Sequence, residues 1–170
     1  IDVVTGQPLT IVGSPSNIVG PGGTGWGGFT NSNYLTLPIV NTGVSGLTAL
    51  LVGKGIADSG GAWDIGSSSG ANNYFTFNSA IYTDALLSIG RQDIITPPAG
   101  SFSKPWCLAV TCANTVKSNN WALYFNGQLL RENSSVTLGL AATPLLGKDS
   151  GGAGAFSGEI YGFILLNDFI

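Results

Sequence analysis

Residues 121–130 read WALYFNGQLL, and they carry the clearest local signal in the chain. The large apolar residues Trp121, Leu123 and Phe125 alternate with Ala, Tyr and Asn, a period of two that is typical of a strand with one buried face. The Asn-Gly pair that follows accepts positive φ at both positions, as a type I′ turn requires. The stretch therefore predicts a β-hairpin that returns through the final Gln-Leu-Leu.

The rest of the chain repeats short strand-like runs between turn residues, and helical periodicity is almost absent. Clusters of Gly, Pro, Asn and Ser, such as GPGGTGWGG at residues 20–28, separate the runs. Many short strands with turn chemistry between them are typical of a sandwich or jelly roll. We predict one all-β domain over residues 1–170, an antiparallel two-sheet jelly-roll sandwich. Strands are expected at residues 9–12, 34–37, 47–52, 62–65, 74–77, 85–89, 106–112, 121–125, 128–130, 144–146 and 159–166.

Charge is scarce in this sequence. Only 9% of the 170 residues are charged, with six Lys or Arg, nine Asp or Glu and a net charge of −3. The basic residues are scattered, whereas phosphate binding needs clustered ones, so no nucleic-acid partner is expected. No window approaches the roughly 20 apolar residues of a spanning helix, so we expect no membrane insertion. A surface of Gly, Ser, Asn and Thr lacks like-charge repulsion, which favours a packed assembly; a secreted domain with a neutral polar coat is the alternative.

Few residues are suited to catalysis. The chain has no histidine, which removes Ser-His-Asp and Cys-His nucleophiles and histidine-ligated zinc. Glycoside hydrolysis needs two carboxyl groups about 5–10 Å apart, but Glu132 and Glu159 have no acidic neighbour at a suitable spacing; a pair of aspartates stays open. We expect no enzyme, no catalytic residue and no resident metal. Cys107 and Cys112 fall on opposite faces of one predicted strand, so we expect free thiols.

Motifs in the C-terminal half resemble the laminin G-like jelly roll of the concanavalin A-like superfamily. They are WCLAVT at residues 106–111, the YFNG that closes the first hairpin strand, PLLG at 144–147 and FSGEI at 156–160. The N-terminal half agrees more loosely, and its opening DVVTG at residues 2–6 resembles the start of such domains in phage tail and head proteins. The resemblance implies a concanavalin A-like sandwich over nearly the whole chain. That fold serves lectins, hydrolases, adhesion modules and virion proteins, so it does not specify a function.

Aromatic and amide residues near predicted loops are candidates for carbohydrate binding. An aromatic face stacks on a sugar ring, and Asn or Asp fixes its hydroxyl groups; loops are where such residues are commonly placed. The candidates are Trp26, Trp63, Asp64, Asn72 and Tyr74. In the alternative interpretation Trp63 belongs to the core and Trp26 closes one end of the sandwich.

Two further patterns concern cofactor binding. Residues 20–25 match G-x-G-x-x-G, but loop and strand follow them where a dinucleotide site needs a helix, so we expect a glycine-rich surface loop. Calcium remains open, because carboxylates of Asp58, Asp64 and Asp149 lie in or beside Gly-rich loops. These aspartates lack an Asp-x-Asp-x-Asp run, and aspartate is also a common turn residue. We therefore expect no cofactor.

Two functional hypotheses follow. The first is a non-enzymatic structural and interaction module on the surface of a larger assembly, such as a phage-like virion, where it serves as a capsid decoration, cement or tail-adhesion subunit. It implies protein partners, a homo-oligomer and a location on a virion or extracellular surface. The alternative is a carbohydrate-binding module or lectin with a cell-surface glycan as partner. Because the chain begins at Ile1, we expect a fragment or a processed product.

Overall fold

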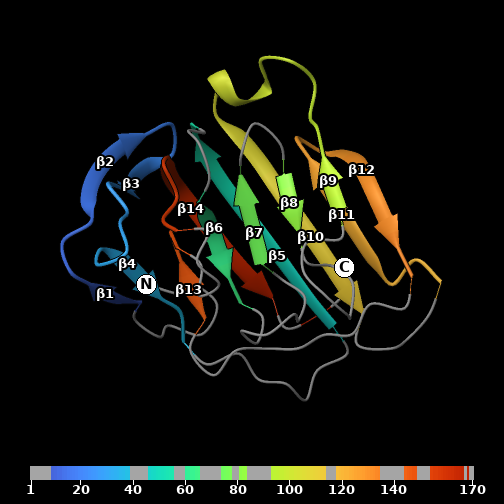
Figure 1. Cartoon of the computed structure of the whole chain (residues 1–170), viewed down its shortest axis with the longest axis horizontal. Helices are drawn as coiled ribbons and strands as arrows, with labels where there is room; N and C mark the ends of the chain where they lie inside the picture. Colours follow the sequence, from blue (N-terminus) through green and yellow to red (C-terminus); the bar gives the residue numbers. More distant parts are fainter. Residues whose placement is uncertain are drawn as a thin grey trace.

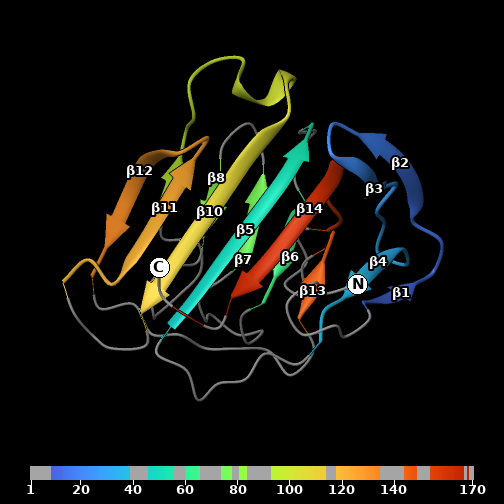
Figure 2. The same ribbon diagram turned by 180° about the vertical axis from the view of Figure 1, so that it is seen from behind.

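The computed structural model describes residues 9–38, 46–55, 60–65, 74–77, 81–83, 93–113, 118–134, 144–148, 154–166 and 168; for 74–77, 81–83 and 93–94 it describes the backbone alone. Within them the chain forms two antiparallel seven-stranded sheets that face each other (Figures 1 and 2) and one 3-10 turn, η1, at Ser101–Ser103. The predicted all-β two-sheet sandwich is confirmed. None of the described segments is a helix long and apolar enough to cross a membrane.

We call the two layers sheet A and sheet B. Sheet A has the order β1-β4-β13-β6-β7-β8-β9, with β1 Thr10–Val12, β4 Tyr34–Thr36, β13 Leu145–Leu146, β6 Gly61–Asp64, β7 Tyr74–Phe77, β8 Ile81–Thr83 and β9 Asp93–Ile95. Sheet B has the order β12-β11-β10-β5-β14-β3-β2, with β12 Gln128–Asn133, β11 Trp121–Phe125, β10 Trp106–Ala113, β5 Gly46–Lys54, β14 Glu159–Leu166, β3 Gly23–Gly27 and β2 Ser16–Gly20. The predicted strand at 85–89 lies outside the described residues.

The hairpin predicted from residues 121–130 is present as β11 and β12. Its turn residues Asn126 and Gly127 have φ angles of 51° and 80°, as a type I′ turn requires. The turn is also tied to the neighbouring strand, because the Cys107 amide donates to Asn126 Oδ1 at 2.8 Å and the Asn126 amide donates to the Cys107 carbonyl at 2.8 Å. The Asn side chain therefore fixes the hairpin against β10.

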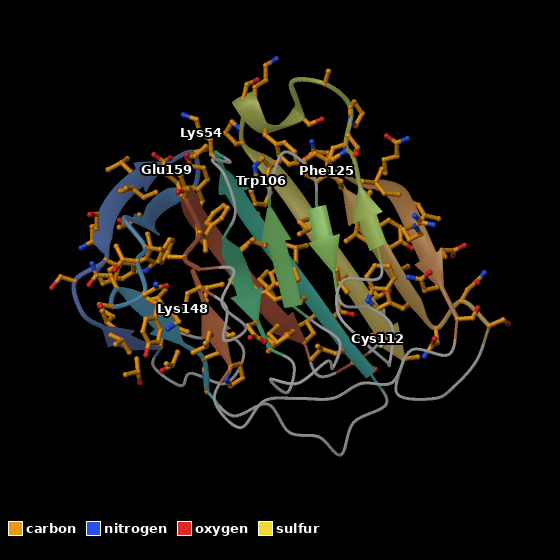
Figure 3. All side chains as sticks on the ribbon, in the orientation of Figure 1. Lys54, Trp106, Cys112, Phe125, Lys148 and Glu159 are labelled. Atoms are coloured by element: carbon orange, nitrogen blue, oxygen red, sulfur yellow. The ribbon has the colours of Figure 1, made fainter. Side chains whose placement is uncertain are left out.

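The core lies between the sheets and is built largely from alternate residues of β10 and β11. Trp121, Leu123 and Phe125 are at most 3% exposed, as predicted. Leu108 is the Cα partner of Phe125, so both point to the same face. Trp106 stacks on Phe125 with ring centroids 6.1 Å apart (both are labelled in Figure 3). Burial of each large apolar side chain contributes about 1.5–3 kcal/mol.

Strand β14 changes its buried face partway along. A register shift between Ile160 and Gly162 places one extra residue, Tyr161, in the strand. Ile160 before the shift is 2% exposed, whereas after it Phe163 packs against the core and Ile164 is 47% exposed. From the sequence alone, either of two alternating sets could face the core, Phe163 and Leu165 or else Ile160, Ile164 and Leu166. The bulge explains why the core takes one residue from one set and its neighbours from the other.

The sequence suggested a surface loop for the glycine-rich stretch at residues 20–28. In the structure this stretch instead forms most of the β2–β3 hairpin. Its glycines are required by a close neighbour. A Cβ added at Gly20 would lie 2.2 Å from Cδ1 of Tyr161, and one at Gly25 would lie 2.4 Å from the Ile160 carbonyl oxygen. The bulged tyrosine of β14 thus rests directly on the hairpin, and glycine inside a strand marks this close approach.

Both cysteines lie on β10 and neither forms a disulfide. Cys112 is 1% exposed, and burial raises the pKa of its thiol to about 11. Cys107 is half-buried on the opposite, outward face of the strand, and burial raises its pKa as well. A raised pKa leaves less thiolate at neutral pH, so both thiols are poor nucleophiles.

Candidate functional site

The structure distributes the five predicted carbohydrate residues over both sheets. Trp26 lies on β3 of sheet B, whereas Trp63 and Asp64 end β6 of sheet A. Tyr74 begins β7, where its backbone alone is described, and Asn72 lies outside the described residues. No single site gathers the described members of the set.

The two candidates on β6, Trp63 and Asp64, are buried. Trp63 is 0% exposed, and its ring reaches across the core to Phe163 with centroids 5.5 Å apart. A sugar cannot stack on a ring with no exposed face, so Trp63 is corrected from a candidate binding residue to a core residue. Asp64 is 5% exposed and is the Cα partner of Tyr74, which brings these two positions together on neighbouring strands.

Trp26 is the one of the four tryptophans that keeps contact with solvent, because Trp63, Trp106 and Trp121 are at most 1% exposed. Its Cα partner on one side is Ile160, which points into the core. The indole ring therefore lies on the inward side of sheet B, where it packs against the core at one end of the sandwich.

Residues around Trp26 on the same side of the hairpin are exposed. Asn17 is its Cα partner on β2, and Thr24 is two residues away on β3, so both share its face. Val19, the partner of Thr24, is 92% exposed. On β1 of sheet A the inward-facing Ile11 is 50% exposed. Here the inner faces of both sheets reach solvent.

We call this surface the Trp26 edge and define it by Trp26, Asn17, Thr24, Val19 and Ile11. It lies where β1 and β2, joined by only residues 13–15, turn from one sheet into the other (Figure 1). Its members provide one large aromatic ring, an amide, a hydroxyl and two aliphatic side chains, and none of them is charged. Such a surface suits a neutral ligand that has an apolar face and hydroxyl groups.

Tyr161 braces the Trp26 edge from the opposite side of the hairpin. Its ring occupies the space that a side chain at Gly20 would fill, and its hydroxyl donates a hydrogen bond to Oε2 of Glu159. Burial, and after it the hydrogen bond and negative charge of Glu159, raises the pKa of Tyr161 to about 12. The phenol therefore stays neutral at physiological pH, and the brace is intact there.

A second half-buried aromatic, Tyr34, already has a cation over its ring. The Nζ atom of Lys148 lies 4.5 Å from the ring centroid of Tyr34 and donates to the Asn31 carbonyl at 3.3 Å. A cation held over the ring covers one stacking face. Tyr34 is thus less suited than Trp26 to stack on a sugar ring, although both lie in the N-terminal part of the chain.

The glutamates do not form a catalytic pair. Glu132 lies on β12 and Glu159 on β14, four strand spacings apart in sheet B. At about 4.8 Å per spacing their backbones are roughly 19 Å apart, well beyond the separation used in glycoside hydrolysis. Within the described part of the chain no group of three or more His, Cys, Asp or Glu residues could hold a metal ion. Asp58 and Asp149 lie outside that part.

Sequence reasoning found Trp26 but missed Asn17 and Thr24. Both lie in strands that the glycine content concealed. The sequence carried no clear signal for them, because the SNIVG of residues 16–20 does not alternate apolar with polar residues. Once the hairpin is formed, the register alone places the amide beside the indole ring.

No protein-family model matches the chain, and no curated protein matches its sequence. Several solved structures match its fold. Domain 4 of AbnA, a GH43 extracellular arabinanase from Geobacillus stearothermophilus solved in complex with arabinotriose, superposes with a TM-score of 0.67 at 16% identity, over 98% of this chain and 86% of that one.

Two toxin structures match in a similar way. The binding domain of Paraclostridial Mosquitocidal Protein 1 has a TM-score of 0.69 at 10% identity and covers 98% of this chain. A structure of botulinum neurotoxin type C, whose cell entry depends upon interaction with two ganglioside molecules, has a TM-score of 0.66 at 8% identity and covers 96%. This chain spans 45% and 43% of those two chains. At such identities the likeness concerns the fold, and the chain adopts the antiparallel jelly-roll sandwich that its sequence predicted.

Proposed function

We propose that the chain is a non-enzymatic carbohydrate-binding module and that the Trp26 edge is its binding surface. The observation that carries the proposal is that Trp26 is only half-buried and keeps contact with solvent, while the other three tryptophans are buried. An aromatic ring at the surface beside an exposed amide and an exposed hydroxyl matches the two chemical sides of a sugar ring. The indole packs on the apolar C–H face, and Asn17 and Thr24 bind hydroxyl groups.

The lack of charge on the Trp26 edge narrows the ligand class. With no Lys, Arg, Asp or Glu among its members, the edge has nothing to pair with a carboxylate or phosphate. A neutral oligosaccharide is therefore the preferred ligand. The structural likeness to an arabinanase domain solved with arabinotriose supports this class, and the extracellular setting of that enzyme supports a location outside the cell.

A glycan array tests the proposal directly. The purified module is applied to immobilised neutral oligosaccharides, including arabinan fragments, and to sialylated and ganglioside-type glycans. Wild type is expected to retain one class of neutral glycan. Trp26→Ala should lose at least about 2 kcal/mol of binding free energy, roughly 30-fold in affinity, as removal of a central aromatic contact does. Asn17→Ala, which removes an exposed side chain, should weaken binding without affecting the fold.

The matched control is Tyr124→Ala, which removes a half-buried aromatic from the outward face of sheet B, away from the Trp26 edge. It should leave glycan binding unchanged. Circular dichroism verifies that each variant is folded. Equal glycan binding by wild type and Trp26→Ala would refute the proposed site. A wild type that binds no glycan at all would refute the proposed function.

A second candidate function is a subunit of a larger assembly, such as a decoration, cement or tail-adhesion protein of a phage-like virion. It is favoured by the outward face of sheet B, which carries a row of uncharged Cα partners across five strands: Ile164, Leu50, Ala109, Tyr124 and Leu129. The two functions are compatible in a protein that attaches a particle to glycans. Antibodies against the module should label intact virions from its source. Virions that remain unlabelled and lack the chain by mass spectrometry would contradict this role.

A further inference from the structure

The tip of the β11–β12 hairpin carries a chemically labile pair of residues. Asn126-Gly127 is the one Asn-Gly sequence in the chain, and asparagine is among the thermolabile residues of proteins. In deamidation the backbone nitrogen of the following residue attacks Cγ of the asparagine side chain and ammonia leaves, which closes a five-membered succinimide. Water then adds to either succinimide carbonyl and opens the ring, to aspartate or to iso-aspartate.

The pair is open to water. Asn126 and Gly127 are both exposed, and a Cβ built at Gly127 would meet no atom of the described chain within 4 Å. Glycine also has no Cβ of its own to hinder the attack by its nitrogen. In an unfolded chain Asn126 should therefore deamidate faster than the other asparagines of the sequence.

Two restraints hold the reacting atoms apart in the native turn. The first is the pair of 2.8 Å hydrogen bonds that join the Asn126 side chain and amide to the backbone of Cys107; they direct the side chain to β10, while the main chain continues to β12. The second is the backbone angle, because ψ of the first central residue of a type I′ turn is about +30°. At that angle Cβ of Asn126 and the Gly127 nitrogen lie on nearly opposite sides of the Cα–C bond, whereas succinimide closure needs them on the same side.

We infer that Asn126 is a deamidation site which the native turn keeps closed, so that its modification records the opening of this hairpin. Reaction requires that both hydrogen bonds to Cys107 break and that the backbone leaves its φ of 51°. Each ordinary hydrogen bond lost on opening lowers the open population several-fold, so the two together should slow deamidation by about tenfold or more. The inference concerns the opposite edge of sheet B from Trp26 and does not depend on glycan binding.

The two products should differ in their effect on the fold. An aspartate carboxylate at position 126 still accepts a hydrogen bond from the Cys107 amide, and aspartate tolerates positive φ. Iso-aspartate instead routes the main chain through the former side chain and adds one carbon to it. A two-residue turn then cannot keep Phe125 and Gln128 in register, so iso-aspartate should detach the turn from β10.

Ageing the intact chain beside its own tryptic peptide tests the inference. Trypsin cuts after Lys117 and Arg131 and releases residues 118–131 as one peptide, and an isolated hairpin is at best marginally stable in water. Both samples are kept in the same warm, mildly alkaline buffer, and mass spectrometry of this peptide measures asparagine, aspartate and iso-aspartate at position 126. Deamidation should be at least about tenfold slower in the folded chain than in the peptide. Equal rates in the two samples would overturn the inference, and so would a peptide in which Asn126 does not react.

A sample of the full chain that is aged unfolded in urea and then refolded separates the two products. A short protease treatment removes molecules with an open hairpin, and the surviving full-length chain should contain aspartate but little iso-aspartate at position 126. Asn126→Asp is the matched control, because it carries the modified side chain on an unaltered main chain, and it should refold and resist the protease like wild type. Survivors with as much iso-aspartate as the untreated sample would overturn the inference. Neither result bears on glycan binding, because the β2–β3 hairpin lies at the opposite edge of sheet B (Figure 2).

Discussion

Replacing Gly20 by alanine should destabilise the module, although the change adds a single methyl group. Gly20 lies on β2, and its new Cβ would stand 2.2, 2.5 and 2.8 Å from three ring carbons of Tyr161. Real Cβ atoms do not approach so closely, and the ring cannot move freely because its hydroxyl is bonded to Glu159. The hairpin or the tyrosine must shift.

The expected cost is about 1–3 kcal/mol, the usual range for overpacking. Gly22→Ala is the control in the same hairpin, because a Cβ there has no atom within 4 Å. It should be neutral, or stabilising by up to about 1 kcal/mol through the unfolded state. In urea denaturation with an m-value of about 2 kcal/mol/M, a loss of 2 kcal/mol lowers the midpoint by about 1 M.

A double-mutant cycle separates the steric effect from any general intolerance of β2 to alanine. In a Tyr161→Ala background the ring is gone, so Gly20→Ala should cost far less than in wild type. Equal costs in the two backgrounds would refute the close contact between β2 and β14. So would Gly20→Ala and Gly22→Ala variants of equal stability.

The remaining predictions concern ionisation and the hairpin turn. The pKa of Tyr161 is raised to about 12 from an unfolded value near 10. Its contribution to stability is therefore complete below about pH 10 and is lost as the pH rises towards 12. Ultraviolet titration should show one tyrosine that ionises late in wild type and is absent in Tyr161→Phe; a wild type without a late tyrosine would contradict the Glu159 hydrogen bond. Asn126→Ala should lower the free energy of unfolding by about 1–3 kcal/mol, because alanine is disfavoured at φ 51° and the hydrogen bond from the Cys107 amide is lost. Asn126→Gly accepts this backbone angle and should recover part of that stability in thermal unfolding. An Asn126→Ala variant as stable as wild type would contradict the turn.

The fold could be predicted where the local sequence pattern alone determines the backbone conformation and the buried face. In residues 106–112 and 121–125 the apolar period of two matches the buried face of the strands, so the paired core of β10 and β11 followed from the pattern. Asn126-Gly127 likewise specified its turn, because few other residue pairs accept both φ angles.

The sequence missed strands β2, β3, β8 and β9. For β2 and β3 the reason is a tertiary contact that overrides the local preference. Gly20 and Gly25 look like loop residues, yet they are glycine because Tyr161 and the β14 backbone approach the hairpin closely. The bulge at Tyr161 also mixed the two alternation patterns of β14. Neither contact is visible until β2, β3 and β14 are known to be neighbours.

The candidate site was predicted only in part for the same reason. The sequence left two interpretations of Trp63 open, a sugar-binding residue or a core residue, and the structure shows a core residue that contacts Phe163 of the other sheet. Trp26 remained at the surface because it lies near the edge of sheet B. The positions of Asn17 and Thr24 beside Trp26 are set by the register of the hairpin, and no sequence motif marks them.

The most direct test of the Trp26 edge uses tryptophan fluorescence. Since Trp63, Trp106 and Trp121 are at most 1% exposed, iodide should quench the emission of Trp26 alone, and Trp26→Phe should show almost no quenching. Addition of the best neutral oligosaccharide from the array should protect wild type from iodide to the level of Trp26→Phe, in a saturable manner. An oligosaccharide that binds with full affinity and leaves the quenching of Trp26 unchanged would show that the glycan binds elsewhere and would contradict the account.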